Sequence, residues 1–239
     1  MNIIVTRPEE DGAPLKLKLE AMGHSVILMP LLQIVPRKSV FITKRPYQAV
    51  VATSANGIRA LTGHGNIKGL PMLTVGPQSM KAAQDAGFRK VEAHGRDLGG
   101  LVAYIKANLK PEAGPILYLS GNETAGDLEG QLNQAGFDCW RAIVYDAVQA
   151  KDASLVESPL RNREVDAVLL YSPRSTRIWC KVIWDAGLIE EAAAAHYFCL
   201  SRNVAATLPK TWSHTVAKTP DEAAMLALLA PGAGKRLRE

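Results

Sequence analysis

The chain has 239 residues, of which 47% are hydrophobic and 21% charged, and its formal net charge is +5. This length is comfortable for two domains of about 100 to 120 residues, and the composition excludes wholesale disorder. The modest basic excess fits an acidic small-molecule ligand, but it equally fits ordinary solubility charge. The only basic run is the tail at residues 235–238, and no aromatic residues are interleaved with it. We therefore expect no nucleic-acid partner.

The N-terminal residues and the cysteines bear on where the protein works. A strand-like run begins at once, without a signal peptide, and no apolar stretch approaches the length of a membrane span. Cys139, Cys180 and Cys199 are odd in number, widely separated and never in a CxxC pair, which predicts reduced thiols rather than disulfides or zinc ligands. The five histidines show no metal-binding spacing. We expect a cytoplasmic protein with no membrane contact and no metal site.

Short β-branched runs alternate with helical patterns along the chain. Residues 2–5 predict a strand, residues 8–22 a helix that ends near Gly23, and residues 25–29 a second strand. Residues 30–36 and 142–149 break the alternation, because each is extended and apolar and leaves its strand without a following helix. We interpret these two segments as paired connectors between domains.

Each type of unit occurs twice. The opening strand–helix–strand returns at residues 116–144, and the strand at 72–75 with its turn and helix resembles the one at 197–200. Residues 49–61 and 167–179 both run from an apolar strand through a hydroxyl-rich turn into a helix that carries Arg. Alternating β and α units predict an α/β fold with parallel sheets and helices on both faces. Ligands bind such sheets beyond the carboxyl ends of the strands, where these turns fall.

The turns supply the candidate ligand-binding residues. Backbone N–H groups and hydroxyls at a helix start could bind a carboxylate, although Ser and Thr are also preferred helix caps in any protein. Arg7, at the end of the first strand, could hold a carboxylate or form an ion pair with Glu9 or Glu10. We expect the four tryptophans to pack in the core or between domains. The candidate ligand-binding residues are Arg7, Thr53, Ser54, Ala55, Gly76, Ser79, Ser172 and Ser201.

Five motifs in order resemble the uroporphyrinogen-III synthase family. They are Val5-Thr6-Arg7-Pro8, Met29-Pro30-Leu31-Leu32, Thr53-Ser54-Ala55-Asn56-Gly57, Val75-Gly76-Pro77 and Val144-Tyr145. The resemblance implies two flavodoxin-like, doubly wound domains joined by a two-stranded β linker. Domain 1 would be discontinuous (1–34 and 149–239), domain 2 would span 39–139, and the linker strands would be 30–38 and 140–148. The turn Ser201-Arg202-Asn203 departs from the family's Gly-Pro-Thr type.

The resemblance also implies an activity. Enzymes of this family take the linear tetrapyrrole hydroxymethylbilane, invert its terminal ring D and close the macrocycle with loss of water, using no metal or organic cofactor. Tyr145 matches the tyrosine that the family places in the connector, so it is the candidate catalytic residue. The other candidates would bind the substrate's carboxylates. A transient contact with hydroxymethylbilane synthase is expected, and the protein is expected to be a monomer.

Two alternatives remain. The first is a non-catalytic two-domain ligand-binding or regulatory module of the same fold, although no segment is spare for an output element such as a helix-turn-helix. The second is a two-lobed sugar- or anion-binding receptor, which the missing export signal disfavours.

Overall fold

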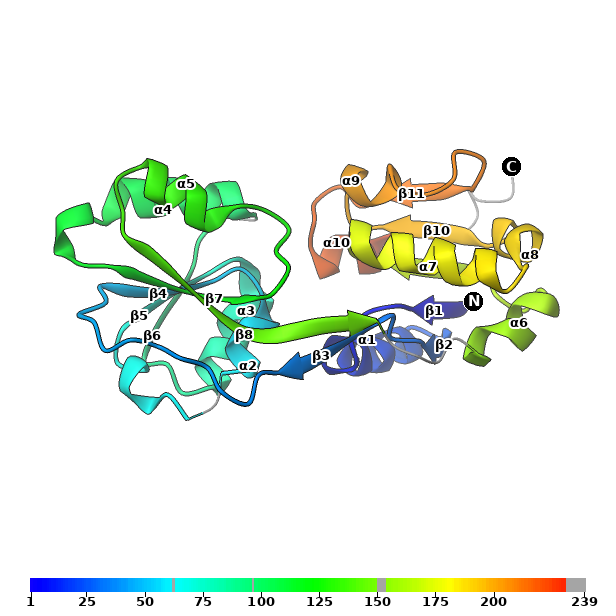
Figure 1. Ribbon diagram of the computed structural model, residues 1–239. Coiled ribbons are helices and arrows are strands. Elements are labelled where there is room, and N and C mark those ends of the chain that lie inside the picture. Colours follow the sequence, from blue (N-terminus) through cyan, green and yellow to red (C-terminus); the bar gives the residue numbers. More distant parts are fainter. Residues whose placement is uncertain (62, 96, 150–153, 231–239) are drawn as a thin grey trace. The chain divides into compact units, whose positions relative to one another are not determined.

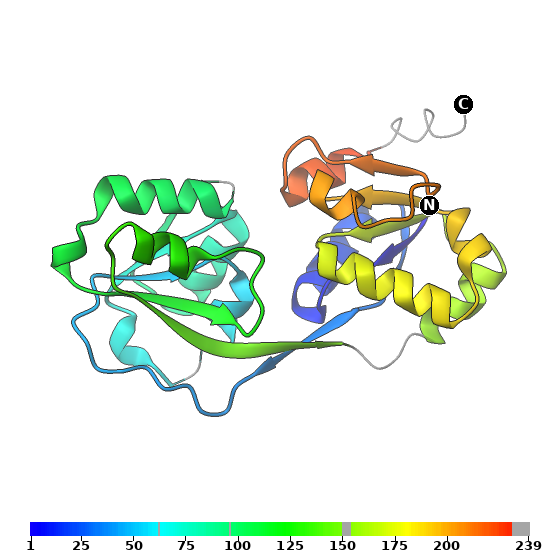
Figure 2. The same ribbon diagram turned by 45° about the horizontal axis from the view of Figure 1, so that its top comes forward.

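The computed structural model describes residues 1–230, apart from residues 62, 96 and 150–153. The basic tail noted in the sequence lies outside the described residues. The chain forms two compact units: unit 1 comprises Met1–Gln33 and the chain from Val148 onward, and unit 2 comprises Ile34–Ala147. Each unit has a parallel sheet with helices on both faces (Figures 1 and 2). In the part of the chain that is described, no helix has the length and apolarity needed to cross a membrane.

Unit 1 contains a five-stranded sheet in the spatial order β2-β1-β9-β10-β11. All neighbouring strands are parallel, so numbered along the chain the order is 2-1-3-4-5. The elements are β1 (Asn2–Val5), α1 (Glu9–Ala21), β2 (Ser25–Leu28), α6 (Glu157–Arg161), β9 (Ala167–Leu170), α7 (Pro173–Asp185), α8 (Ile189–Ala193), β10 (His196–Cys199), α9 (Arg202–Ala205), β11 (His214–Val216) and α10 (Glu222–Ala227), with a 3₁₀ turn at Ser154–Val156.

The sheet of unit 1 separates two apolar layers. All four residues of β9 are buried, as expected for a strand that is covered on both faces. On one face Val168 packs with Trp179 and Ile183 of α7. On the other face Leu169 packs with Leu19 of α1 and with α10. The central strands are therefore fixed from both sides, and their carboxyl ends are held at one edge.

Unit 2 contains a six-stranded sheet in the order β3-β8-β7-β4-β5-β6. The strands from β4 to β8 are parallel to their neighbours, and β3 lies at the edge beside β8. The elements are β3 (Leu32–Pro36), β4 (Ala49–Ala52), α2 (Ala55–Arg59), β5 (Pro71–Thr74), α3 (Gly76–Asp85), β6 (Lys90–Ala93), α4 (Leu98–Asn108), β7 (Ile116–Gly121), α5 (Leu128–Gln134) and β8 (Cys139–Gln149), with 3₁₀ turns at Gly65–Ile67 and Pro111–Ala113.

Unit 2 also has three layers. Helices α2 and α3 pack on one face through Ile58 and Ala83, and helices α4 and α5 pack on the other through Leu101 and Leu132 (Figure 1). Alternate residues of the strands supply the two cores, as the period of two along a strand requires.

The two sheets share one spatial arrangement. The order β2-β1-β9-β10-β11 in unit 1 matches the order β8-β7-β4-β5-β6 in unit 2, strand for strand. The chain passes through the five positions in the same cyclic order in each unit, but it starts at a different position. The strand at 49–52 and the strand at 167–170, which the sequence marks as a repeat, both occupy the central position.

The tryptophans divide into two groups. Trp179 and Trp212 are buried, at 0% and 4% exposure, as expected. Trp140 and Trp184 are 39% and 72% exposed, so neither packs in a core. Trp184 lies five residues after Trp179 on α7, which turns it about 140° away from the buried face. Trp140 follows the buried Cys139 on β8, and successive strand residues point to opposite faces.

Candidate active site

The parallel strands of unit 2 bring several predicted site residues to one edge. Thr53, Ser54 and Ala55 follow the central strand β4, and Gly76 and Ser79 follow its neighbour β5. Strands β4 and β5 are parallel and in register, so their carboxyl ends lie side by side. These five residues therefore lie at one edge of the sheet.

The turn after β4 is held by its own hydroxyls. The Ser54 Oγ accepts a hydrogen bond from the backbone N–H of Asn56 at 3.2 Å and caps the five-residue helix α2. The Thr53 Oγ1 lies 3.2 Å from the Tyr118 hydroxyl. Burial raises the pKa of Tyr118, so its hydroxyl stays protonated and can donate to Thr53. Helix capping, which we gave as the alternative interpretation to anion binding, is therefore observed at Ser54.

The turn after β5 is built differently. Gly76 has φ +70°, a conformation that favours glycine. Among the described residues, no side chain caps the ten-residue helix α3 that begins here. Ser79, in the first turn, is buried. The two helix starts at this edge therefore differ, because a side chain caps α2 and none caps α3.

Tyr145 lies on β8 beside the carboxyl end of β7, and its side chain is largely buried, at 8% exposure. Its partner in the ladder is Gly121, the last residue of β7, and its carbonyl oxygen accepts the N–H of Asn122 at 3.0 Å. The candidate catalytic tyrosine is therefore in the same unit, and at the same end of the sheet, as the turns after β4 and β5.

The carboxyl edge of unit 1 carries the remaining candidates. Arg7 follows β1, Ser172 follows β9 and Ser201 follows β10, which are neighbouring strands. Ser172 caps α7, because its Oγ accepts the N–H of Ser175 at 3.0 Å. Ser201 caps the four-residue helix α9 through the N–H of Val204. Both hydroxyls therefore act as helix caps.

Arg7 forms ion pairs, but not with the neighbours proposed from the sequence. Its Nη2 donates to the Asp11 carboxylate at 3.0 Å and its Nη1 to the Glu222 carboxylate at 3.3 Å. Its guanidinium carbon lies 4.7 Å from the centre of the Tyr171 ring. Asp11 takes the place of Glu9 and Glu10 as the partner; it is buried, whereas Glu9 and Glu10 are exposed.

Two residues near Tyr145, Arg141 and Gly121, were missed by the sequence reasoning. Arg141 of β8 donates to the Ser120 Oγ and to the carbonyl oxygens of Gly121 and Asn122, each at 2.8 Å. Gly121 touches the Tyr145 ring so closely that a Cβ would stand 2.6 Å from its Cζ. No local pattern marks these contacts, because they depend on how two strands pair.

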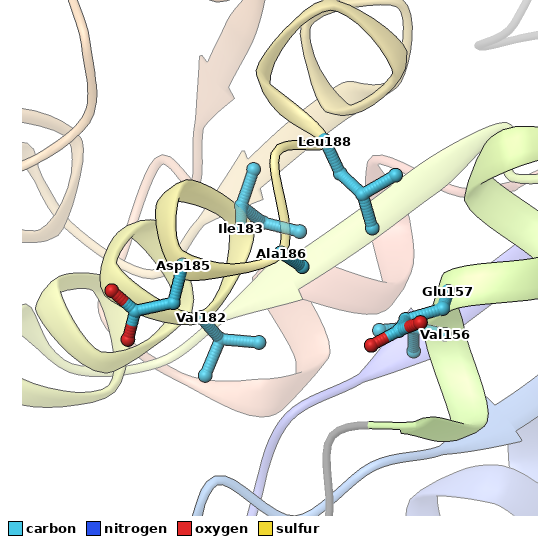
Figure 3. A pocket seen from close by; sticks show the side chains of 7 residues that line it. All are labelled: Val156, Glu157, Val182, Ile183, Asp185, Ala186 and Leu188. Carbon is cyan, nitrogen blue, oxygen red and sulfur yellow. The ribbon is translucent and has the colours of Figure 1, made fainter.

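The cavity in Figure 3 lies elsewhere, in unit 1. It measures about 240 Å³ and has an apolar floor with Glu157 and Asp185 at its rim. None of the residues that line it is a candidate from the sequence. Its full lining is Val156, Glu157, Val182, Ile183, Asp185, Ala186 and Leu188.

The cysteines are free, and no group of metal-binding side chains lies within the described residues. Burial raises the pKa of the Cys139 and Cys199 thiols to about 12, so both stay protonated near neutral pH.

Parallel sheets with polar turns at their carboxyl edges define the class of α/β proteins that bind ligands at those edges. A family model described as uroporphyrinogen-III synthase HemD matches residues 13–227. A uroporphyrinogen-III synthase from Chlorobaculum parvum is 22% identical over 212 residues, covering 81% of this chain and 83% of that protein. The chain belongs to the uroporphyrinogen-III synthase family, whose members are cyclising lyases of tetrapyrrole biosynthesis.

Solved structures agree on the fold. A uroporphyrinogen-III synthase from Helicobacter pylori superposes with a TM-score of 0.65 at 17% identity, covering 95% of this chain and 97% of that one. A mutant enzyme from Thermus thermophilus gives 0.54 at 15% identity, covering 96% and 97%. The mixed α/β fold with parallel sheets expected from the sequence is confirmed.

Proposed function

We propose that this protein converts hydroxymethylbilane to uroporphyrinogen III, with Tyr145 as the catalytic residue. The observation that carries the proposal is the placement of Tyr145 at the same edge of unit 2 as the polar turns after β4 and β5. The family match over residues 13–227 supports it independently.

The reaction has one chemical demand that a side chain can meet. The lone pair of the ring A nitrogen expels the hydroxymethyl oxygen, and this oxygen needs a proton to leave as water. The Tyr145 hydroxyl supplies or shares that proton. The substituted carbon of ring D then attacks the exposed methylene, and the resulting spiro intermediate fragments and recloses. The proton that ring D loses when it becomes aromatic again restores the tyrosine, so the only net loss is water.

The larger demand is geometric. Closure of the free substrate without inversion gives the type I isomer, so the protein must hold the chain in the inverting arrangement, which is a positioning effect. We assign the binding of acetate and propionate groups to the turn at Thr53, Ser54 and Ala55 and to the helix start at Gly76 and Ser79. Arg7, Ser172 and Ser201 would serve the same purpose in unit 1.

The domain assignment belongs to the proposal as well. We propose two flavodoxin-like domains, 1–34 with 149–239 and 39–139, joined by linker strands at 30–38 and 140–148. The strand order 2-1-3-4-5 in unit 1, which is that of flavodoxin-like folds, supports this assignment. The division between the two units within β3 and β8 also supports it. The protein would act in the cytoplasm as a monomer and receive its unstable substrate through transient contact with hydroxymethylbilane synthase.

The test is an isomer assay. Hydroxymethylbilane would be generated in place from porphobilinogen, incubated with the protein and oxidised, and the uroporphyrin isomers separated by chromatography. We expect the product to change from type I to type III. Type I alone, from folded protein and fresh substrate, would contradict the proposed activity and favour the non-catalytic binding module.

A separate substitution tests the role of Tyr145. Tyr145→Phe should lower kcat by about tenfold, the cost of one hydrogen bond made in the transition state, without abolishing turnover. Full activity in this variant would remove the hydroxyl from the mechanism.

A further inference from the structure

We propose that Gly121 and Arg141 are positioning residues that hold the Tyr145 ring in its working orientation. The proposal rests on the proposed function and adds two residues to it. Neither residue was singled out by the sequence, and both act through Tyr145 and the end of β7.

The first observation is a break in strand register. Ser120 pairs with Ile143 and Gly121 pairs with Tyr145, so Val144 is an extra residue in β8. In a regular strand Tyr145 would point away from the face that Ala142 and Val144 share, because side chains alternate. The extra residue instead places Tyr145 in the same core as Val144, on the α2 and α3 face. Such bulges re-aim side chains, and this one re-aims the tyrosine.

The second observation is the absence of a side chain at Gly121. A Cβ built there would lie 2.6 Å from Cζ, 2.7 Å from Cε2 and 2.9 Å from the hydroxyl oxygen of Tyr145. Real Cβ atoms do not approach other atoms this closely, so any larger residue must push the phenol aside. Gly121 does not have a positive φ, so glycine is needed here for space rather than for backbone conformation.

The third observation is the anchoring of the backbone at Gly121. Arg141 donates through Nε to the Ser120 Oγ and through Nη2 to the carbonyl oxygens of Gly121 and Asn122. The Ser120 hydroxyl in turn donates to the Gly121 carbonyl at 3.0 Å. A planar guanidinium fixes several acceptors at once, which the single ammonium of lysine does not do. Arg141 thus fixes the surface against which the Tyr145 ring lies.

Together these three features hold the Tyr145 phenol in one position. The bulge selects the face, Gly121 leaves room for the ring tip, and Arg141 fixes the strand end that the ring contacts. A catalytic group that is held in this way loses little freedom when the substrate arrives, and a small displacement is costly. Gly121 and Arg141 should therefore affect turnover more than substrate binding.

The experiment measures the phenol directly and then the rate. The protein contains six tyrosines, and their ζ-carbons can be labelled and observed in a carbon NMR spectrum. The signal that is missing from the spectrum of the Tyr145→Phe variant belongs to Tyr145. Gly121→Ala and Arg141→Lys should shift that signal and leave the others in place. The matched control is Gly69→Ala, because a Cβ at Gly69 meets nothing within 4 Å. An unmoved Tyr145 signal in Gly121→Ala would overturn the proposal without any use of activity.

Kinetics supply the second readout. Gly121→Ala should lower kcat by about tenfold at nearly constant KM, as Tyr145→Phe does. In the Tyr145→Phe background, Gly121→Ala should lower kcat by less than about twofold, because both substitutions act on the Tyr145 hydroxyl. Equal losses in the two backgrounds would contradict the proposal. If Gly121→Ala fails to fold, Arg141→Lys carries both measurements. A wild-type protein that makes no type III isomer would refute the proposed function instead, and the NMR test of the phenol's position would still decide this inference.

Discussion

Arg7, at the end of β1, forms ion pairs that stabilise the fold, in addition to its proposed role in substrate binding. Its side chain, only 11% exposed, contacts Asp11 and Glu222, whose side chains are 9% and 26% exposed. Glu222 also accepts from Lys18 at 2.5 Å. These contacts connect the N-terminal elements β1 and α1 with α10, which is distant in sequence. The predicted role in substrate binding would therefore require Arg7 to share its guanidinium between these carboxylates and the substrate.

The Arg7→Ala variant separates the two roles. Removing the guanidinium takes away the Arg7 ion pair of the 9% exposed Asp11 side chain and one of the two ion pairs of Glu222, so the free energy of unfolding should fall by about 3 kcal/mol. Urea unfolding followed by circular dichroism would measure this loss. Arg177→Ala, at an exposed position of α7, is the control and should change stability by less than about 0.5 kcal/mol. Unchanged stability together with a raised KM would show that Arg7 acts on the substrate rather than on the fold.

At the scale of elements, β3 depends on a few specific contacts with β8. The Arg37 side chain makes two hydrogen bonds of 2.9 Å with the Asp146 carboxylate, and its backbone N–H donates to Val144. Arg37 holds the pKa of Asp146 below its ordinary value. A carboxylate with a lowered folded-state pKa stabilises the fold above its unfolded pKa of about 3.9, and this contribution disappears as the pH falls through the folded-state value.

This linkage predicts a pH-dependent difference at β3. At pH 7 the Asp146→Asn variant should exchange the Arg37 amide hydrogen faster than the wild type. Below the lowered folded-state pKa of Asp146 the two proteins should converge, because this carboxyl is then protonated in both the folded and unfolded states. Hydrogen exchange corrected for the intrinsic rate would measure this. Asp85→Asn, in an exposed pair with Lys81, should leave the Arg37 amide unaffected. A difference that persists undiminished at pH 3 would contradict the role of the carboxylate charge.

Elements were the part of the fold that the sequence predicted best. The strands at 2–5 and 72–75 and the turns at Thr53 and Ser172 could be located because β-branched runs and hydroxyl caps are local signals. The extra residue at Val144 could not, because one inserted residue leaves the composition of a strand unchanged while reversing the direction of Tyr145. The Arg7–Glu222 pair spans 215 residues and left no local signal either. The side-chain partners of the site therefore required the structure.

At the scale of the whole molecule, the two units use one strand arrangement in two chain orders. In unit 2 the chain visits the five shared positions as β4, β5, β6, β7 and β8, all in one continuous segment. In unit 1 the equivalent positions are filled by β9, β10, β11, β1 and β2. The last two of these positions, held by β7 and β8 in unit 2, are thus filled in unit 1 by strands from the N-terminal end of the chain. Unit 2 is therefore a natural precedent for a circularly permuted unit 1.

The permutation makes a prediction about independent folding. Residues 30–149 should fold cooperatively alone, since all six strands and both apolar layers of unit 2 lie within them. Residues 148–239 alone should not fold, because β1 lies between β2 and β9, and Ile3, Leu15 and Leu19 supply much of one core. A chain that joins residues 148–239 through a Gly/Ser linker to residues 1–33 should fold again, because it follows the strand order of unit 2. Circular dichroism during urea unfolding would show a single steep transition for the first and third chains and none for the second. A permuted chain that stays unfolded would mean that the strand order of unit 2 does not transfer to unit 1, despite their shared arrangement.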